Sequence, residues 1–157
     1  MTIFSNTRRL GTGDYIPTFQ LKDQDGKWMK FPEAFQHKGA IIYFYPKDES
    51  GICTKEACAF RDNFKSFSDA GFQVIGINSG SMESHKAFQK NHRLPFTLLS
   101  DPGNEVFKMF GIKNVLFLTG RETFVVDKKG KILHKFRDFL NGEKHIEEAL
   151  QALKIIN

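Results

Sequence analysis

The stretch GAIIYFYPKDESGICTKEACAF, residues 39–60, decides the fold, because it joins an uninterrupted apolar run to a segment with helical periodicity. Its first seven residues, 39–45, carry no charge, which is typical of a strand buried on both faces of a sheet. Further along, apolar side chains recur at spacings of three and four and predict a helix over 53–69; they are Ala57, Phe60, Phe64 and Phe67. A strand leading into a helix is the first half of an α/β unit.

The remainder of the chain continues this alternation. The runs FQVIGIN (72–78) and FTLLSD (96–101) predict two more strands, separated by a helical segment for which Ser81 is the expected N-cap. Hairpins are predicted at Asp25-Gly26 and Lys129-Gly130, and an amphipathic helix at the C-terminal end, over 142–156. We therefore expect an α/β fold with a central mixed β-sheet and helices on both faces.

Composition limits the classes of protein to consider. A chain of 157 residues is expected to form a single domain, 1–157, with 1–12 as a partly ordered lead-in, and 17 Phe suggest an aromatic core. The net charge of +5 comes from lysines mixed with acids, which favours a solvated surface and no nucleic-acid partner. Neither a signal peptide nor a membrane span is apparent, so we expect a cytoplasmic protein with reduced thiols.

The two cysteines of the chain, Cys53 and Cys58, lie five positions apart. Cys53 falls at the start of the predicted helix, where free N–H groups and the helix dipole favour a thiolate over a thiol. In an intact helix, residues five apart have Cα atoms roughly 8.7 Å apart. A disulfide needs Cα atoms within about 7 Å, so the pair can close only if the helix unwinds locally. This suits a cycle in which Cys53 is oxidised to a sulfenic acid and Cys58 then attacks it.

The two thiols are also compatible with roles outside such a cycle. Both could be small buried residues of the core. A zinc site would need different spacings, and the five histidines are isolated and expected at surface or edge positions; they are His37, His85, His92, His134 and His145. A thioredoxin-type exchange enzyme would have two residues between its cysteines, whereas this chain has the four residues TKEA. A redox-sensing binding protein would share the disulfide but react only once.

The segment YFYPKDESGICTKEACAFRDNF (43–64) resembles the active-site segment of peroxiredoxins, and most closely that of the Q type, the bacterioferritin comigratory protein branch. Three further segments are similar to that family, and the resemblance covers residues 13–155; the segments are GDYIPTFQLKDQDGK, LLSDPGNEVFKMFG and RETFVVDKKGKI. The resemblance implies a thioredoxin-like fold.

The resemblance also implies roles for individual residues. Cys53 is matched to the peroxidatic thiol, Cys58 to the resolving thiol and Arg121 to the active-site arginine. Pro46 and Ser50 occupy the proline and hydroxyl positions of the family motif, with Ser50 in place of the commoner threonine. We expect Ser50 and Arg121 to donate hydrogen bonds to the reacting peroxide, and Pro46 to fix the loop and shield the thiolate.

Two more features of the segment bear on this site. The usual Pro-Gly before the peroxidatic cysteine is here Gly51-Ile52. Glu56, three residues after Cys53, is a candidate to orient Arg121, although an exposed acid in the first helical turn is an almost equal alternative.

The function implied by the resemblance is that of a thiol-dependent peroxidase. It would reduce hydrogen peroxide and alkyl hydroperoxides through a Cys53 sulfenic acid, which Cys58 resolves as an intramolecular disulfide. A dithiol reductant such as thioredoxin would recycle the enzyme. No metal, haem or flavin is expected, because sulfur carries the electrons, and we expect a monomer.

Overall fold

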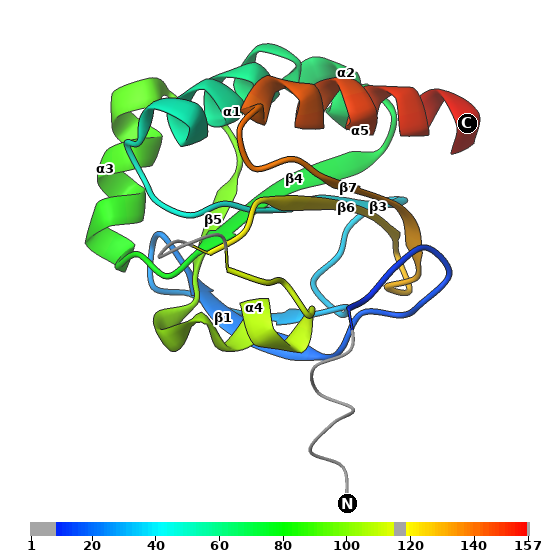
Figure 1. Ribbon diagram of the computed structural model, residues 1–157, viewed down its shortest axis with the longest axis horizontal. Helices are drawn as coiled ribbons and strands as arrows, with labels where there is room; N and C mark the ends of the chain where they lie inside the picture. The colour runs from blue at the N-terminus through cyan, green and yellow to red at the C-terminus, as the bar shows by residue number, and fades with distance from the viewer. Residues whose placement is uncertain (1–8, 115–118, 157) are drawn as a thin grey trace, which may run out of the picture.

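The fold is built around one mixed sheet of seven strands in the order β2-β1-β5-β4-β3-β6-β7, as seen in a computed structural model that describes residues 9–114 and 119–156 (Figure 1). The strands are β1 (Phe19–Asp23), β2 (Trp28–Phe31), β3 (Gly39–Phe44), β4 (Phe72–Asn78), β5 (Thr97–Ser100), β6 (Glu122–Asp127) and β7 (Ile132–Arg137). Strands β3, β4 and β5 run parallel, whereas β1 and β6 pair antiparallel with their neighbours. The predicted mixed sheet is confirmed.

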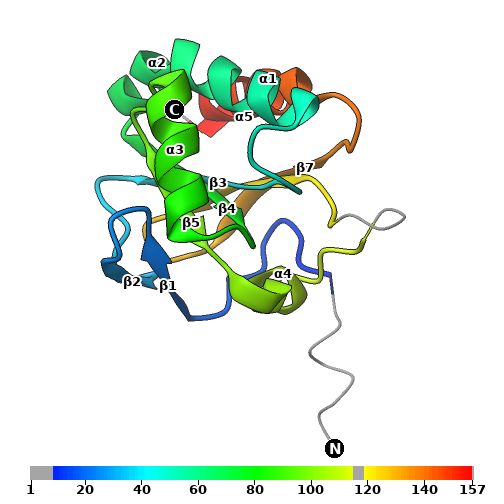
Figure 2. The same ribbon diagram turned by 90° about the vertical axis from the view of Figure 1, so that its left-hand side faces the viewer.

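Helices cover the two faces unevenly. The helical elements are α1 (Gly51–Asp62), α2 (Phe64–Asp69), α3 (Met82–His92), η2 (Pro102–Asn104), α4 (Glu105–Met109) and α5 (Gly142–Ile156). Figures 1 and 2 show α1, α2 and α5 together above the sheet and α4 below it. Side chains from α3 join the upper layer, because Phe88 belongs to the same core cluster as Phe60 of α1 and Ile146 of α5.

The alternation of side chains along β3 produces two separate cores. Ile41 and Tyr43 point into the layer of α1, α2, α3 and α5, whereas Ile42 and Phe44 point into the layer of α4 and the β1–β2 hairpin. All six residues of β3 are buried, as the uncharged run predicts. Phenylalanine dominates both layers, which confirms the aromatic core.

The helix predicted over 53–69 is two helices in the structure. The first helix, α1, begins at Gly51, and Asn63 separates it from α2. The Asn63 side chain donates a hydrogen bond of 2.8 Å to the Ala59 carbonyl, four residues earlier, and its φ of −108° departs from the helix. The apolar spacing continues across this break, so the sequence pattern did not predict that the helix would be interrupted at Asn63.

Four smaller findings concern the chain ends, the loops and the helices. Residues 1–8 of the expected lead-in lie outside the described residues, whereas Leu10 is buried and Arg9 forms an ion pair of 3.1 Å with Glu122. Ser81 caps α3 by accepting a hydrogen bond from Ser84 N, as predicted. Both predicted hairpins are present, at β1–β2 and at β6–β7. Within the described residues, no helix has the length and apolar character to cross a membrane.

Candidate active site

Cys53 lies in the first turn of α1, directly beyond the carboxyl end of the central strand β3. Ser50 is the N-cap residue, with extended φ and ψ of −73° and 154°, so Cys53 is the third residue of the helix. The side chain of Cys53 is only 1% exposed and packs in the core cluster of α1 and α5. Its place among the free N–H groups at the helix start is the one predicted from the sequence.

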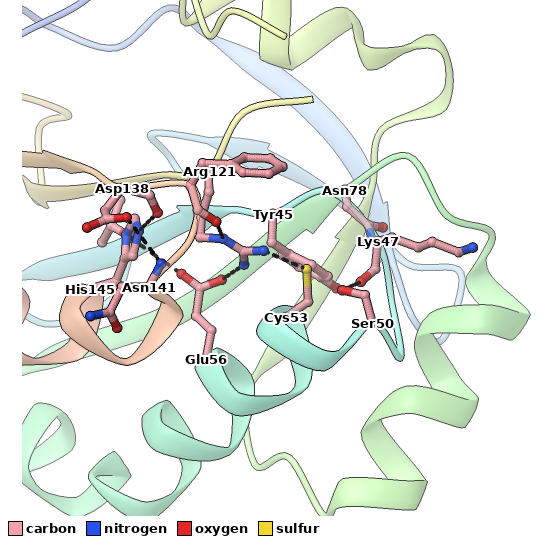
Figure 3. Close-up of polar contacts among 12 residues, drawn as sticks. Tyr45, Lys47, Ser50, Cys53, Glu56, Asn78, Arg121, Asp138, Asn141 and His145 are labelled. Carbon is pink, nitrogen blue, oxygen red and sulfur yellow. Dashed lines mark hydrogen bonds and ion pairs between the residues drawn. The ribbon is translucent and has the colours of Figure 1, made fainter. Parts of the chain in front are cut away.

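Arg121 contacts Cys53 from the residue directly before β6. Its Nη2 donates a hydrogen bond of 3.1 Å to the Cys53 sulfur, and its Nε donates one of 3.0 Å to the Phe139 carbonyl. Burial acts to lower the pKa of Arg121, but the Glu56 carboxyl and the Cys53 sulfur outweigh it and raise that pKa. The guanidinium is therefore a permanent positive charge against the sulfur (Figure 3).

Glu56 fixes the other side of this guanidinium. One of its oxygens, Oε1, lies 2.5 Å from Arg121 Nη1, and the residue is completely buried. The structure thus supports orientation of Arg121 by Glu56 and contradicts the alternative of an exposed first-turn acid. Burial raises the pKa of Glu56 to about 8, although the charge of Arg121 and its hydrogen bond oppose the rise. The pKa of Glu56 therefore lies well above that of an ordinary glutamate.

His145 of α5 lies behind Glu56 and is also completely buried. Burial lowers its pKa to about 4, so its ring is neutral. Nε2 donates a hydrogen bond of 2.8 Å to the Asp138 carbonyl, and Nδ1 accepts one of 2.7 Å from the Thr123 hydroxyl. The same Nδ1 lies 3.7 Å from Glu56 Oε2. A chain of side chains therefore runs from Cys53 through Arg121 and Glu56 to α5 (Figure 3).

Gly142, the first residue of α5, allows this close approach. A Cβ at this position would lie 2.8 Å from the Ile52 carbonyl oxygen and 2.8 Å from Glu56 Cβ, both in the first turns of α1. Such contacts are too short for any side chain, so glycine alone lets the two helices meet here. The sequence suggested no such role for Gly142.

Cys58 lies on the second turn of α1, half-buried, and both cysteines are free thiols. Because α1 is continuous from Gly51 to Asp62, the helical separation of the two residues applies as predicted, and the resting dithiol is held apart. The neighbouring Phe60 is fully buried, and its ring centroid lies 4.5 Å from that of Tyr43.

Pro46 and Ser50 lie in the loop that connects β3 to α1, and both are half-buried. The Ser50 hydroxyl donates a hydrogen bond of 3.2 Å to the Lys47 carbonyl, and it makes no side-chain cap for α1. In this structure the Ser50 hydroxyl therefore stabilises the loop to which it belongs.

The histidine prediction was wrong for two of the five residues. His85 and His145 are completely buried, with both ring nitrogens hydrogen-bonded. Their partners are distant in sequence: Asp48 lies 37 positions from His85, and Thr123 lies 22 positions from His145. Only the folded chain reveals these pairs. Among the described residues, no three ligand-type side chains gather to hold a metal ion.

The raised pKa of Glu56 predicts that stability falls as pH rises from 6.5 to 8. In that range the folded protein keeps a proton that the unfolded chain, with a carboxyl pKa near 4.5, has lost. The limiting slope for one proton is about 1.4 kcal/mol per pH unit. His145 acts in the opposite sense, because its lowered pKa makes stability rise between pH 4 and 6.5.

Glu56→Gln should remove this fall while keeping the shape of the side chain. The measurement is urea unfolding of the reduced protein at pH 5.5, 6.5, 7.2 and 8, for wild type and variant. The free energy of unfolding of wild type relative to Glu56→Gln is expected to decrease across the whole range from pH 5.5 to 8, because His145 contributes equally to both proteins. Parallel pH curves for the two proteins would contradict the burial of a proton at Glu56.

Comparison with known proteins places this arrangement in a family. Residues 12–135 match the model of the AhpC/TSA family. Chloroplastic peroxiredoxin Q of Populus jackii is 47% identical over 155 residues, which are 98% of this chain and 71% of that protein. The chain therefore belongs to the AhpC/TSA peroxiredoxins, within the Q type, and it is a thiol peroxidase.

Solved structures agree with this placement. Peroxidoxin BcpB of Mycobacterium tuberculosis superposes with a TM-score of 0.86 at 31% identity, covering 95% of this chain and 99% of that one. The bacterioferritin comigratory protein of Xanthomonas campestris, in a structure concerned with alkyl peroxide reduction, gives a TM-score of 0.81 at 25% identity, over 91% and 99% of the two chains. The thioredoxin-like fold expected from the sequence is confirmed.

Proposed function

We propose that Cys53 is the peroxidatic residue of this peroxidase and Cys58 its resolving residue. The observation that carries the assignment is the 3.1 Å hydrogen bond from Arg121 Nη2 to the Cys53 sulfur, in the first turn of a helix. A cation and a helix N-terminus together stabilise a thiolate, which is the reactive form of cysteine. Cys58 lies one turn and a half further along α1, away from the helix N-terminus and without the hydrogen bond from Arg121 that Cys53 receives.

The first step is attack of the Cys53 thiolate on one peroxide oxygen. A sulfur–oxygen bond forms, the O–O bond breaks, and the second oxygen leaves as hydroxide or alkoxide, which takes up from solvent the proton that Cys53 released when it ionised. The products are a Cys53 sulfenic acid and water or an alcohol. Arg121 is the donor placed to stabilise the leaving oxygen, and rotation of the Ser50 hydroxyl would bring a second donor. Pro46 restricts the conformation of the loop and limits the access of water to the Cys53 thiolate.

The second step is attack of the Cys58 thiolate on the Cys53 sulfenic sulfur. A disulfide forms and hydroxide leaves, which becomes water by taking up the proton that Cys58 released; an external dithiol then reduces the disulfide to two thiols while it is itself oxidised. We propose thioredoxin or a similar protein as that dithiol. The fold and site need no metal, haem or flavin for these steps, since sulfur exchanges all the electrons.

We further propose that hydrogen peroxide and alkyl hydroperoxides are both substrates. A cavity of about 490 Å³ lies beside the Arg121 guanidinium and would accommodate an alkyl group against Phe139 and Gly120; its other lining residues are polar or charged, namely Lys113, Asn114, Glu122, Arg137 and Asp138. We propose a cytoplasmic location, because the cycle requires a compartment that keeps thiols reduced. We also propose that the protein is a monomer and that residues 1–157 form one domain. The chloroplastic location in the name of the Populus protein belongs to that protein.

The test of the proposed function is steady-state consumption of peroxide with thioredoxin, thioredoxin reductase and NADPH. Oxidation of NADPH should depend on the protein, on thioredoxin and on either hydrogen peroxide or cumene hydroperoxide. Many turnovers for each protein molecule would exclude the redox-sensor alternative, which predicts a single oxidation. Peroxide consumption that did not depend on thioredoxin would contradict the proposed reductant.

The continuous α1 helix predicts a structural change on oxidation. Closing the disulfide must unwind one or two turns of α1 and release Phe60 from Tyr43. Amide hydrogen exchange should therefore become faster in residues 53–60 of the oxidised protein, with β3 and β4 unchanged. Equal protection of 53–60 in both forms would mean that the helix survives and that no Cys53–Cys58 bond resolves the sulfenic acid.

A further inference from the structure

A buried polar cluster holds the loop before Cys53 on the side away from Arg121. Its centre is Asp48, in the loop between β3 and α1 and only 7% exposed. We propose that Asp48 and His85 are positioning residues for Cys53: they fix this loop, and with it the first turn of α1, against β4, β5 and α3. This inference rests on the proposed role of Cys53 as the peroxidatic thiol.

Four side chains donate hydrogen bonds to the Asp48 carboxylate. Tyr45 Oη and Asn78 Nδ2 bind Oδ1 at 2.7 and 3.3 Å, whereas Ser84 Oγ and His85 Nδ1 each bind Oδ2 at 2.7 Å. Burial acts to raise the pKa of Asp48, but the hydrogen bonds and the charge of His85 outweigh it and lower that pKa. All the available directions of the carboxylate are thus used, so the loop has one preferred position.

His85 is held as tightly as the carboxylate it binds. Its Nδ1 faces the Asp48 carboxylate, and its Nε2 lies 3.1 Å from the Leu99 carbonyl of β5. A carboxylate and a carbonyl oxygen can only accept hydrogen bonds, so each ring nitrogen of His85 faces an acceptor. The ring is completely buried, and through these two contacts it bridges the loop to the sheet.

The surrounding backbone is shaped for this cluster. Asn78, the last residue of β4, accepts a hydrogen bond of 2.9 Å from Gly80 N at its Oδ1, so its Nδ2 is turned toward Asp48. A Cβ on Gly80 would lie 3.2 Å from His85 Cε1 and 3.3 Å from Asp48 Oδ2. Glycine at position 80 therefore leaves room for the contact between Asp48 and His85.

Cys53 therefore lies between two anchors. On one side Arg121 and Glu56 tie α1 to β6 and α5, and on the other Asp48 ties the preceding loop to β4 and α3. Figure 3 shows Arg121 and His145 to one side of Cys53 and Asn78 and Lys47 to the other. Reaction in line with the O–O bond requires the sulfur to be placed within a fraction of an ångström, and loosening either anchor degrades that placement. The cluster also stabilises a loop in which Gly51 opens the helix without the rigidity of a proline.

The test compares Asp48→Asn and His85→Gln with wild type and with Ile132→Ala. The last variant removes buried core volume from β7, on the other face of the sheet, and so lowers stability without touching the loop. Two quantities are measured in single turnover: the second-order rate of Cys53 oxidation by hydrogen peroxide, and the pH dependence of Cys53 alkylation. Both cluster variants should oxidise roughly ten- to a hundred-fold more slowly, with alkylation shifted to higher pH. Ile132→Ala should match wild type in both quantities.

Two milder variants keep the test decisive should the Asp48 and His85 variants not fold. Tyr45→Phe and Ser84→Ala each remove one hydrogen bond to Asp48 and should slow oxidation by a few-fold, in the same sense. Unchanged oxidation rates and alkylation profiles in the folded cluster variants would overturn the inference. Absence of peroxide reactivity at Cys53 in wild type itself would instead overturn the proposed function, so the two failures are distinguishable.

Discussion

Cys53→Ser is expected to abolish peroxide reduction altogether. A serine hydroxyl ionises far above any working pH, so the Arg121 guanidinium would face a neutral oxygen and no nucleophile would form. The substitution keeps nearly the same shape at a site that is 1% exposed, and the fold should survive. Peroxide consumption with a thioredoxin system is the measurement, and retained circular dichroism shows that the variant is folded.

Cys58→Ser is the matched variant, because it removes the second thiol and leaves the first turn of α1 untouched. One equivalent of peroxide should be consumed and one sulfenic acid formed, trapped by dimedone and identified by mass at Cys53. No disulfide should form and turnover should then stop. Normal turnover in Cys53→Ser, or a sulfenic acid on Cys58, would reverse the assignment of the two cysteines.

Arg121→Ala is expected to have the second largest effect. The residue supplies the cation against the sulfur and a donor for the leaving oxygen, and removing such a group costs about 3–4 kcal/mol of barrier, or 10²–10³ in rate. Oxidation of Cys53 in single turnover should slow by that factor, and alkylation of Cys53 should shift to higher pH. Below pH 8, Glu56 left without its partner is protonated, so no bare carboxylate is buried and the variant should fold.

The control for this variant removes a positive charge elsewhere. Lys108→Ala, on the exposed surface of α4, changes the net charge equally and should leave both measurements at wild-type values. Arg121→Lys should recover only part of the rate, because an ammonium cannot bind the sulfur, Glu56 and the Phe139 carbonyl in the fixed geometry of a guanidinium. An alkylation profile unmoved in Arg121→Ala would remove Arg121 from the role proposed for it.

Local patterns predicted the parts of this molecule that depend on local physics. The uncharged run of β3, the cap at Ser81 and the two glycine turns each follow from forces between neighbours in sequence, and all are present. The helix start near Cys53 was predictable for the same reason, because the free N–H groups and the dipole at a helix N-terminus do not depend on distant residues.

Contacts between distant segments could not be predicted in this way. Burial of Glu56 depends on Gly142, 86 positions along the chain, and nothing near Glu56 distinguishes it from a solvated acid of a first helical turn. The same holds for His85, whose partner Asp48 becomes a neighbour only when α3 packs beside the loop. Arg121 was found through the resemblance alone, since spacing does not mark it.

The interruption at Asn63 determines how much of the oxidised molecule is exposed to its surroundings. Because α2 starts afresh beyond Asn63, melting of α1 has a boundary at which it can stop, and Phe67 of α2 stays under cover. We expect oxidation to uncover a short apolar patch around Phe60 and to leave the remaining aromatic layer intact. In a single uninterrupted helix, unwinding would extend toward residue 69 and expose more apolar surface in each catalytic cycle. We therefore expect the interruption to limit aggregation of the oxidised protein.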